Sequence, residues 1–263
     1  MSARSDLEVA LEAAAAGAAE LRARYRVSGV RESARSKSVR RDLVTDADGA
    51  SEAAILDVLR ARRPHDAVVA EEGSPGAARP ARYWCVDPLD GTLNFAHGIP
   101  VFCVSVALVV DGVARVGVLD APLLGELHET DGAEARLNGE RVQVSATDDL
   151  RDAIVATGFA YDRENLPDDN TASFRNVLMA CRCVRRCGSA ALDLAWVACG
   201  RFDAYWERWV NAWDMAAGAA LVRAAGGRVT DMAGGDRFLA AGHVAASNGA
   251  LHGALLPLLT RPV

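Results

Sequence analysis

The sequence predicts a mixed α/β protein of layered strands and helices, with an N-terminal subdomain over residues 1–147 and a C-terminal subdomain over residues 148–263. Two observations support this prediction. Short apolar runs separated by Gly, Asp and Asn turn signals fill much of the first half, as in meandering sheets. Strand-like and helix-like segments alternate in the second half, as in layered α/β proteins. The polar segment from Ser145 to Arg151 is the expected seam between the halves.

Two helices are predicted near the start of the chain. The first covers residues 6–25, with an apolar stripe formed by Leu7, Leu11, Leu21 and Tyr25. The second is capped by Thr45 or Asp46 and runs to about Arg62, with three side chains directed inward: Ile55, Leu56 and Leu59. The Arg- and Ser-rich segment between them is expected to be a loop or an irregular hairpin.

Buried strands are predicted next, over residues 67–70, 83–86, 102–110 and 113–120, followed by a strand pair that ends near Val144. Their turns carry the hairpin signals Asp111-Gly112, Asp131-Gly132 and Asn138-Gly139. Pro88 has no backbone N–H for a ladder, so we expect the strand of residues 83–86 to end before it.

The second half is predicted to hold both strands and helices. Strands are expected over residues 153–157, 202–206, 228–230 and 243–246. Helices are expected over residues 170–179 and 188–199, from Trp213-Asp214 to a C-cap at Gly226-Gly227, and after the last strand.

Composition and charge argue against several classes of protein. A formal net charge of −6, without a basic stripe, does not suit a nucleic-acid binder. Apolar stretches are interrupted well before the roughly 20 residues of a membrane span, and acidic residues near the N-terminus do not fit a signal peptide. We therefore expect a cytoplasmic protein. Six cysteines in 263 residues make no disulfide framework, and Cys181, Cys183 and Cys187 fit no usual zinc spacing. The cysteines are accordingly expected to be reduced and structural.

Five acidic residues share one kind of position, a strand end or a helix start: Asp48, Glu71, Asp87, Asp90 and Asp214. This is where α/β proteins assemble sites at the edges of their sheets. Gly91-Thr92 adds backbone amides and a hydroxyl, and the combination suits a hard divalent metal together with a phosphate. Taken singly, these acids have simpler interpretations as a surface turn, a helix cap or an exposed strand end.

Four motifs in order resemble the inositol monophosphatase family: Asp42-Leu-Val-Thr-Asp-Ala-Asp48, Ala70-Glu-Glu-Gly73, Trp84-x-x-Asp-Pro-Leu-Asp-Gly-Thr-x-Asn-Phe95 and Trp213-Asp-x-Ala-Ala-Gly218. Weaker matches are Leu137-Asn-Gly139, Thr157-Gly-Phe159 and Gly188-Ser-Ala-Ala-Leu-Asp193. Together they span nearly the whole chain, which makes a chance match improbable. The resemblance implies a layered αβαβα sandwich, Mg²⁺-dependent hydrolysis of a phosphate monoester, and a homodimer.

The resemblance also implies roles for individual residues. Two or three Mg²⁺ ions would be held, the first by Glu71, Asp87 and the Leu89 carbonyl, the second by Asp87, Asp90 and Asp214. Asp48 and the Thr92 hydroxyl would orient the attacking water, and the Gly91 and Thr92 amides would bind phosphate oxygens. The alcohol part of the substrate would face a further set: Gly188, Ser189, Ala190 and Glu207, with Asp90 and Asp214 touching its hydroxyls. These motifs contain no nucleophilic Ser, Cys or His, so direct hydrolysis without a phosphoenzyme is expected.

The substrate is predicted less narrowly than the chemistry. Glu207, seven residues before Asp214, favours a small polyol such as inositol 1-phosphate. A surface acid at a strand end is the simpler interpretation of Glu207. Histidinol phosphate and other sugar or nucleoside monophosphates are alternative substrates, and a regulatory protein-binding role is an alternative of a different class.

The chain departs from the family pattern at a few positions. Ala70 stands where the family usually has glycine, and the hairpin around Asp131 to Ala135 is altered and slightly short. Lys37 is the only lysine, and its role and that of the surrounding Arg-rich loop stay open. His97 matches a frequent family residue and is expected to be structural.

Overall fold

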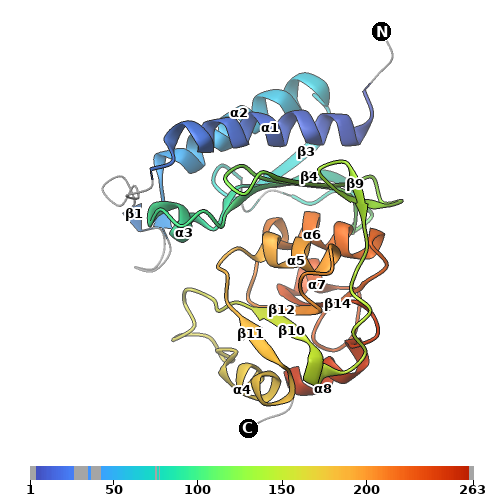
Figure 1. Ribbon diagram of the computed structural model, residues 1–263. Coiled ribbons are helices and arrows are strands. Elements are labelled where there is room, and N and C mark those ends of the chain that lie inside the picture. The colour runs from blue at the N-terminus through green and yellow to red at the C-terminus, as the bar shows by residue number, and fades with distance from the viewer. Residues whose placement is uncertain (1–3, 27–34, 37–42, 75, 77, 261–263) are drawn as a thin grey trace.

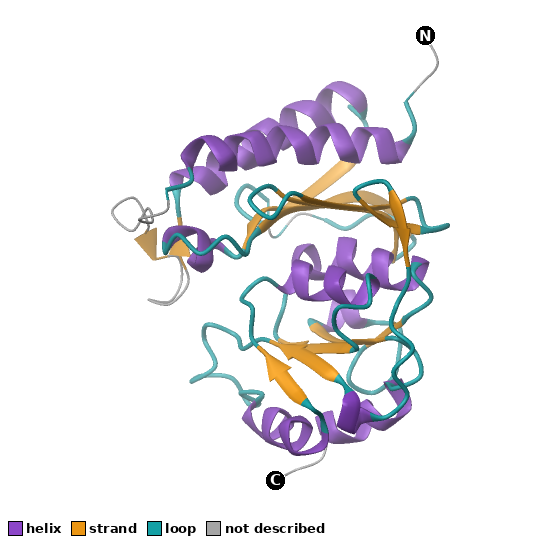
Figure 2. Ribbon diagram, in the orientation of Figure 1, coloured by secondary structure: helices purple, strands orange, loops and turns teal. Residues whose placement is uncertain are grey.

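The computed structural model describes residues 4–26, 35–36, 43–74, 76 and 78–260. Within these residues, two large sheets alternate with three helical layers (Figures 1 and 2). A third, two-stranded sheet is formed by β1 (Arg35–Ser36) and β2 (Leu43–Val44). One outer layer is formed by α1 (Asp6–Arg24) and α2 (Asp46–Arg62), and the other by α4 (Thr171–Ala180) and α8 (His252–Thr260). Between the two sheets lie α5 (Ala190–Ala198) and α6 (Ala212–Ala224). The predicted αβαβα sandwich is confirmed.

The seven-stranded sheet is a meander in chain order, from β3 (Ala67–Ala70) and β4 (Arg82–Asp90) to β5 (Cys103–Val110), β6 (Val113–Ala121), β7 (Glu126–Thr130), β8 (Ala135–Leu137) and β9 (Glu140–Val142). Only the β3–β4 pair is parallel among these strands. The turn between β5 and β6 has positive φ at both Asp111 (51°) and Gly112 (76°), as a two-residue hairpin turn requires. The predicted hairpins are confirmed.

The five-stranded sheet has the order β11 (Cys183–Arg185), β10 (Ile154–Thr157), β12 (Ala204–Arg208), β14 (His243–Ser247) and β13 (Arg228–Thr230). β10 is parallel to both of its neighbours, and the remaining pairs are antiparallel. Four short elements were not predicted: α3 (Thr92–Ala96), the 3₁₀ helix Leu150–Asp152, β11 and α7 (Phe238–Ala241). Segments of three to five residues are too short to show a hydrophobic period.

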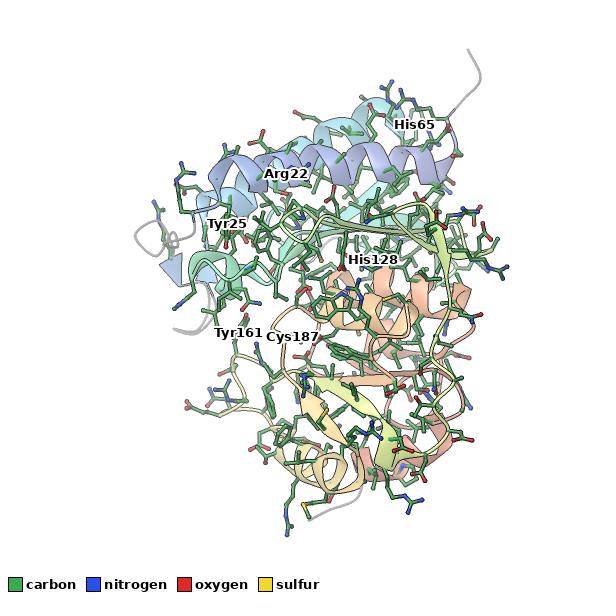
Figure 3. The ribbon with its side chains drawn as sticks, in the orientation of Figure 1. Arg22, Tyr25, His65, His128, Tyr161 and Cys187 are labelled. Atoms are coloured by element: carbon green, nitrogen blue, oxygen red, sulfur yellow. The ribbon has the colours of Figure 1, made fainter. Side chains whose placement is uncertain are left out.

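The apolar core is divided by the sheets into separate layers. Along β4, Tyr83 and Cys85 pack toward α5 and α6, whereas Trp84 and Val86 pack toward α1 and α2. Successive side chains of a strand point to opposite faces, so a sheet covered on both sides needs a continuous apolar run. Polar contacts also join the layers: Glu126 accepts a hydrogen bond from Trp196 on α5 (3.0 Å), next to His128, which Figure 3 labels.

The buried face of α1 differs from the predicted stripe. Leu21 is buried, but Leu7, Leu11 and Tyr25 are only partly buried. The face that meets α2 and the sheet consists mainly of small residues: Val9, Ala10, Ala13, Ala14, Gly17 and Ala18. Such side chains let two helices approach closely, so the helix buries alanines and leaves larger side chains at the margin. Leu56 on α2 is likewise only partly buried, whereas Ile55 and Leu59 are buried as predicted.

The predicted end of β4 at Pro88 is wrong. The strand continues to Asp90, with a register shift between Asp87, which pairs with Ser105, and Asp90, which pairs with Cys103. Three steps on β4 therefore face two on β5, and the extra residue is absorbed as a bulge. Pro88 lies in this interrupted stretch, where its missing N–H costs no ladder bond.

Other sequence predictions concern the buried cysteines, the Arg-rich loop and the lack of a membrane span. Cys85 and Cys103 are buried, as predicted. Lys37, Asp42 and most of the Arg31–Arg41 loop lie outside the described residues, so their predicted roles are not addressed. In the part of the chain that the structure describes, no helix combines the length and apolar character that crossing a membrane requires.

Candidate active site

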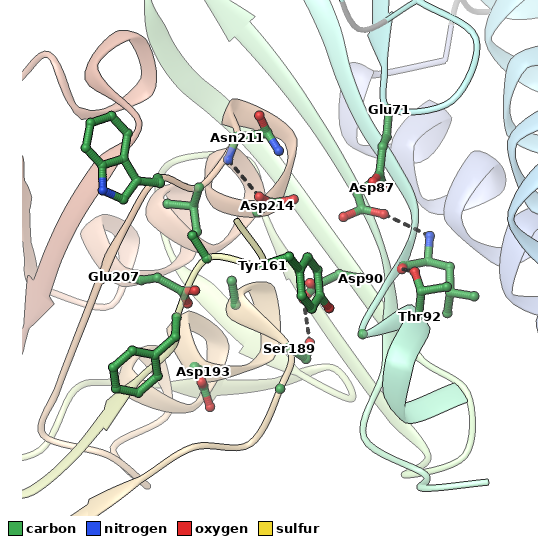
Figure 4. Close-up of a pocket in the computed structure, with 18 of the residues that line it drawn as sticks. Glu71, Asp87, Asp90, Thr92, Tyr161, Ser189, Asp193, Glu207, Asn211 and Asp214 are labelled. Atoms are coloured by element: carbon green, nitrogen blue, oxygen red, sulfur yellow. Dashed lines mark hydrogen bonds between the residues drawn. The ribbon is translucent and has the colours of Figure 1, made fainter. Parts of the chain in front are cut away.

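The bulge at the end of β4 and the turn after it present Asp87, Asp90 and Thr92 to one pocket (Figure 4). The backbone N–H of Leu89 donates to Asp87 Oδ1 at 2.9 Å, which holds the first carboxylate in the bulge. Gly91 has φ of 96° and comes directly before α3. A Cβ there would lie 2.9 Å from the Val101 carbonyl oxygen, so the close approach of the segment just before β5 also requires glycine.

Asp48 combines a helix cap with a contact to Thr92. It lies at the third position of α2, where its Oδ2 accepts hydrogen bonds from the Thr45 backbone N–H (2.7 Å) and the Thr45 hydroxyl (2.6 Å). Its other oxygen, Oδ1, lies 3.1 Å from the Thr92 hydroxyl, which is also 2.9 Å from the Leu89 carbonyl oxygen. Burial raises the pKa of Asp48 to about 6. Capping and the site contact therefore use different oxygens of one carboxyl group.

Asp87, Asp90 and Asp214 form a compact acidic cluster, in which one oxygen of each carboxylate lies within 4.8 Å of the others. Burial, followed by the neighbouring charges of Glu71, Asp90 and Asp214, raises the pKa of Asp87 well above its usual range. Burial and nearby carboxylates raise the pKa of Asp214 in the same way. Like charges this close cannot all stay ionised without a compensating cation or protons.

Two helix N-termini hold the other members of this cluster. Asp90 Oδ2 accepts hydrogen bonds from the Ser189 hydroxyl (2.5 Å) and the Ala191 backbone N–H (2.8 Å) at the start of α5. Asp214 lies in the first turn of α6, where the Asn211 backbone N–H donates to it at 2.7 Å. Helix N-termini stabilise negative charge, so the fold supports carboxylates that burial alone would disfavour.

Glu71 and Leu89 line the same pocket from the seven-stranded sheet. Glu71 directly follows β3, and its backbone N–H donates to the Val86 carbonyl at 3.2 Å, beside Asp87 in Figure 4. Glu71 lies outside the 4.8 Å cluster, although its charge raises the pKa of both Asp87 and Asp214. The sheet therefore presents a further acid next to the cluster.

Glu207 faces the pocket from the five-stranded sheet. The Tyr205 hydroxyl donates to Glu207 Oε2 at 2.6 Å, and burial raises the pKa of Glu207 to about 7. Gly158 packs directly against this carboxylate, and a Cβ at that position would overlap it. Glu207 is 9% exposed, so the simpler interpretation as a surface acid is wrong.

One cavity of about 150 Å³ is lined by all but one of the predicted site residues: Glu71, Asp87, Leu89, Asp90, Gly91, Thr92, Gly188, Ser189, Ala190, Glu207 and Asp214. Asp48 is the exception, and it reaches the site through Thr92. Sequence reasoning assigned no role to several other lining residues: Phe159, Tyr161, Arg186, Asp193, Trp209 and Asn211. Motif matching marked Phe159 and Asp193 without a function, whereas Arg186 carried no signal beyond its charge.

The donor atoms of this pocket fit a hard divalent cation. Neither histidine nor cysteine occurs among the described lining residues, and the acidic cluster offers carboxylate oxygens, the ligands that Mg²⁺ prefers. Burial and neighbouring carboxylates raise the pKa values of Asp87 and Asp214, and bound cations would relieve the repulsion between these groups. The acidic cluster therefore fits a divalent cation such as Mg²⁺.

Comparisons with known proteins agree with this architecture. A model of the inositol monophosphatase family matches residues 3–262. An inositol-1-monophosphatase of Synechocystis is 43% identical over 248 residues, which cover 94% of this chain and 85% of the relative. A protein named Nus factor SuhB from Pseudomonas aeruginosa is 44% identical over 223 residues, or 82% of each chain.

Solved structures give the same result. An inositol monophosphatase from Anabaena superposes with a TM-score of 0.87 at 40% identity and covers 98% of this chain and 96% of its own. The match extends over both sheets and all helical layers, because it leaves almost no part of either chain uncovered. The chain therefore belongs to the inositol monophosphatase family, a family of phosphomonoester hydrolases.

Proposed function

We propose that this phosphatase hydrolyses the phosphate monoester of a small polyol, with inositol 1-phosphate as the leading substrate, in a Mg²⁺-dependent reaction without a phosphoenzyme. The observation that carries the proposal is the shared pocket of an acidic cluster, Asp87, Asp90 and Asp214, and a separate acid, Glu207. The first suits the phosphate end of a substrate and the second its alcohol end. The names of two similar proteins, inositol-1-monophosphatase and inositol monophosphatase, support the same substrate class.

Two sets of residues would hold the cations. Glu71, Asp87 and the Leu89 carbonyl would hold one, and Asp87, Asp90 and Asp214 another, with Asp87 shared. Bound Mg²⁺ supplies positive charge that makes a water more acidic and stabilises the oxygens of the phosphate and the leaving group. The carboxylates position that charge, and the helix N-termini of α5 and α6 orient two of them.

Asp48 and Thr92 would handle the proton of the attacking water. The Thr92 hydroxyl can donate its hydrogen to Asp48 Oδ1, 3.1 Å away, while its oxygen accepts a hydrogen bond from a water in the pocket. Burial raises the pKa of Asp48 to about 6, which makes it a better proton acceptor near neutral pH than an ordinary carboxylate. The cap bonds from Thr45 keep Asp48 oriented while it acts.

The remaining predicted contacts divide between the two ends of the substrate. The Gly91 and Thr92 backbone amides would bind phosphate oxygens beside the acidic cluster. Glu207 would accept a hydrogen bond from a hydroxyl of the alcohol, and its negative charge would disfavour a second phosphate there. Ser189 and Ala190 line the wall between the two ends.

A substrate panel tests this proposal. We expect the highest kcat/KM with inositol 1-phosphate, compared with histidinol phosphate and nucleoside monophosphates, at saturating Mg²⁺. A preference of tenfold or more for histidinol phosphate would contradict the polyol assignment and leave the phosphatase class intact. Phosphate release by Asp90→Asn at the wild-type rate would contradict the metal assignment itself.

A regulatory protein-binding role is the second candidate, because relatives of similar identity are named Nus factors. The Asp90→Asn variant separates the two roles in cells. A phenotype of gene deletion that this variant complements would support binding, and one that it fails to complement would support catalysis. The expected homodimer and cytoplasmic location also stay proposals, testable by analytical ultracentrifugation and by cell fractionation.

A further inference from the structure

Arg186 is the only lysine or arginine among the described residues that line the pocket. It belongs to the segment between β11 and α5 and is exposed at the mouth of the site. Within the described residues it makes no hydrogen bond and no ion pair of 4.0 Å or less, in contrast to most arginines of the chain. A guanidinium that has no partner among the described residues, at the mouth of an acidic pocket, is available to a ligand.

The backbone of Gly188 lets this side chain reach the site. Gly188 has φ of +90°, and a Cβ built on it would lie 2.8 Å from Arg186 Nη1 and 2.9 Å from Asn94 Nδ2. Any larger residue at this position would therefore compete with the guanidinium for the same space. The Asn94 amide is in turn tied to the Cys187 carbonyl at 2.9 Å, which holds the segment against α3.

The charge of Arg186 acts on several acids of the pocket. Burial raises the pKa values of Glu207, Asp90 and Asp193, and the positive charge of Arg186 counteracts part of each rise. Glu207 and Asp87 line opposite sides of the pocket, and Figure 4 shows Asp90 between them. One donor-only group and one acceptor group therefore serve the same end of the cavity.

This pairing matches the chemistry of a hydroxylated alcohol. A hydroxyl donates one hydrogen bond and accepts others, so a polyol is bound best where acceptors and donors lie together. Glu207 accepts, whereas the guanidinium offers several N–H groups in a planar fork. A leaving group without hydroxyls would gain nothing from Arg186.

We propose that Arg186 is a specificity-determining residue that donates hydrogen bonds to hydroxyl oxygens of the leaving alcohol, alongside Glu207. This inference rests on the proposed polyol phosphatase function and adds a residue to it. It predicts that changing Arg186 alters the preference of the enzyme between leaving alcohols and leaves the binding of the phosphate group unchanged.

The test compares two substrates that share a six-membered ring. Inositol 1-phosphate carries hydroxyls next to the ester, and cyclohexyl phosphate carries none. We expect Arg186→Gln to lower kcat/KM for inositol 1-phosphate about tenfold and to leave that for cyclohexyl phosphate within twofold. Arg186→Lys, which keeps the charge but not the fork, should fall between. Arg185→Gln is the matched control, because Arg185 is exposed, adjacent and absent from the pocket lining.

Inorganic phosphate is a second probe, since it has no alcohol part. Its inhibition constant should stay within twofold in Arg186→Gln. Weaker phosphate inhibition, an equal loss on both substrates, or no loss on either would each overturn the inference.

Failure of the proposed substrate can be distinguished from failure of the Arg186 proposal. If the wild-type enzyme does not cleave inositol 1-phosphate, that substrate assignment is wrong, and the comparison is repeated with the better of glycerol 2-phosphate and glucitol 6-phosphate. A tenfold selective loss on that substrate would still support Arg186 as a hydroxyl contact. Cleavage of cyclohexyl phosphate but of no polyol phosphate would overturn both proposals.

Discussion

Replacing Asp48 by asparagine removes a proton acceptor while preserving the shape of the site. Asp48 accepts two bonds from Thr45 through Oδ2 and lies 3.1 Å from the Thr92 hydroxyl through Oδ1. An asparagine can keep its carbonyl oxygen toward Thr45, because Asn also caps helices well. Its amide then faces Thr92 as a donor, so the hydroxyl has no acceptor on that side.

The expected loss follows from this geometry. Removing a positioned general base costs roughly 10²- to 10⁴-fold in rate, or about 3–5 kcal/mol of transition-state stabilisation. The free energy of unfolding should change by less than about 1 kcal/mol, since the cap is kept. We therefore expect kcat for inositol 1-phosphate to fall at least 100-fold, with KM and the melting temperature nearly unchanged.

Steady-state phosphate release and thermal melts measure the two quantities. Thr45→Ala is the stability control. It removes both hydrogen bonds of the Thr45 hydroxyl, to Asp48 Oδ2 and from the Ala47 N–H, and should cost about 1 kcal/mol of stability. The Thr45 backbone bond to Asp48 and the Asp48 carboxyl group remain, so kcat should fall much less than in Asp48→Asn. Because burial raises the pKa of Asp48 to about 6, we expect kcat of the wild-type enzyme to rise with pH near 6, and this rise should disappear in Asp48→Asn. A variant that keeps kcat within threefold of wild type would refute the assignment of Asp48 as the proton acceptor.

Three other predictions concern packing and charge. Gly158→Ala should displace the Glu207 carboxylate, because the new Cβ would overlap it. We expect KM for inositol 1-phosphate to rise about tenfold in the phosphate-release assay. An unchanged KM would argue against a substrate contact by Glu207. Gly49→Ala has no atom within 4 Å of the new Cβ and lies in a helix, so thermal melts should show stabilisation by about 0.5–1 kcal/mol. Burial raises the pKa of Asp48 to about 6 and that of Glu207 to about 7, above the values of roughly 4 in unfolded chains. The folded state then binds more protons than the unfolded state, so the stability of the metal-free protein should fall as pH rises from about 4 to 7. Thermal melts with a chelator at pH 5 and pH 8 measure this change in stability. A higher melting temperature at pH 8 would contradict the prediction. Added Mg²⁺ should raise the melting temperature more at pH 8 than at pH 5, where the carboxylates hold more protons.

Features that depend on near neighbours in the sequence were predicted correctly, whereas features that depend on distant segments were not. Hairpin turns such as Asp111-Gly112 were predicted correctly because positive φ is a property of one or two residues. A helix start capped by Thr45 or Asp46 was also predicted, and Thr45 is the cap in the structure. A cap is a bond between near neighbours, so the local sequence indicates it. The end of β4 was predicted wrongly, because a bulge depends on how the partner strand β5 is spaced.

Packing explains the other differences. Leu7 and Leu11 have the right period for a buried stripe, yet the close approach of α1 and α2 selects the alanine face. Arg186 gave no local signal, because its place in the pocket depends on the missing Cβ of Gly188 and on Asn94 from another segment. Such a contact arises only once both segments are folded.

By itself, the sequence determined the types and order of the longer elements, and it marked the residues that we expect to hold a cation and a phosphate. These follow from backbone preferences, periodicity and the chemistry of oxygen ligands, which act within a few residues. Only the tertiary structure decided that Asp87 and Asp90 from one sheet meet Asp214 from α6 within 4.8 Å, and that Glu207 shares their pocket. The distance between segments more than 100 residues apart is set by the packing of layers, which no local pattern encodes.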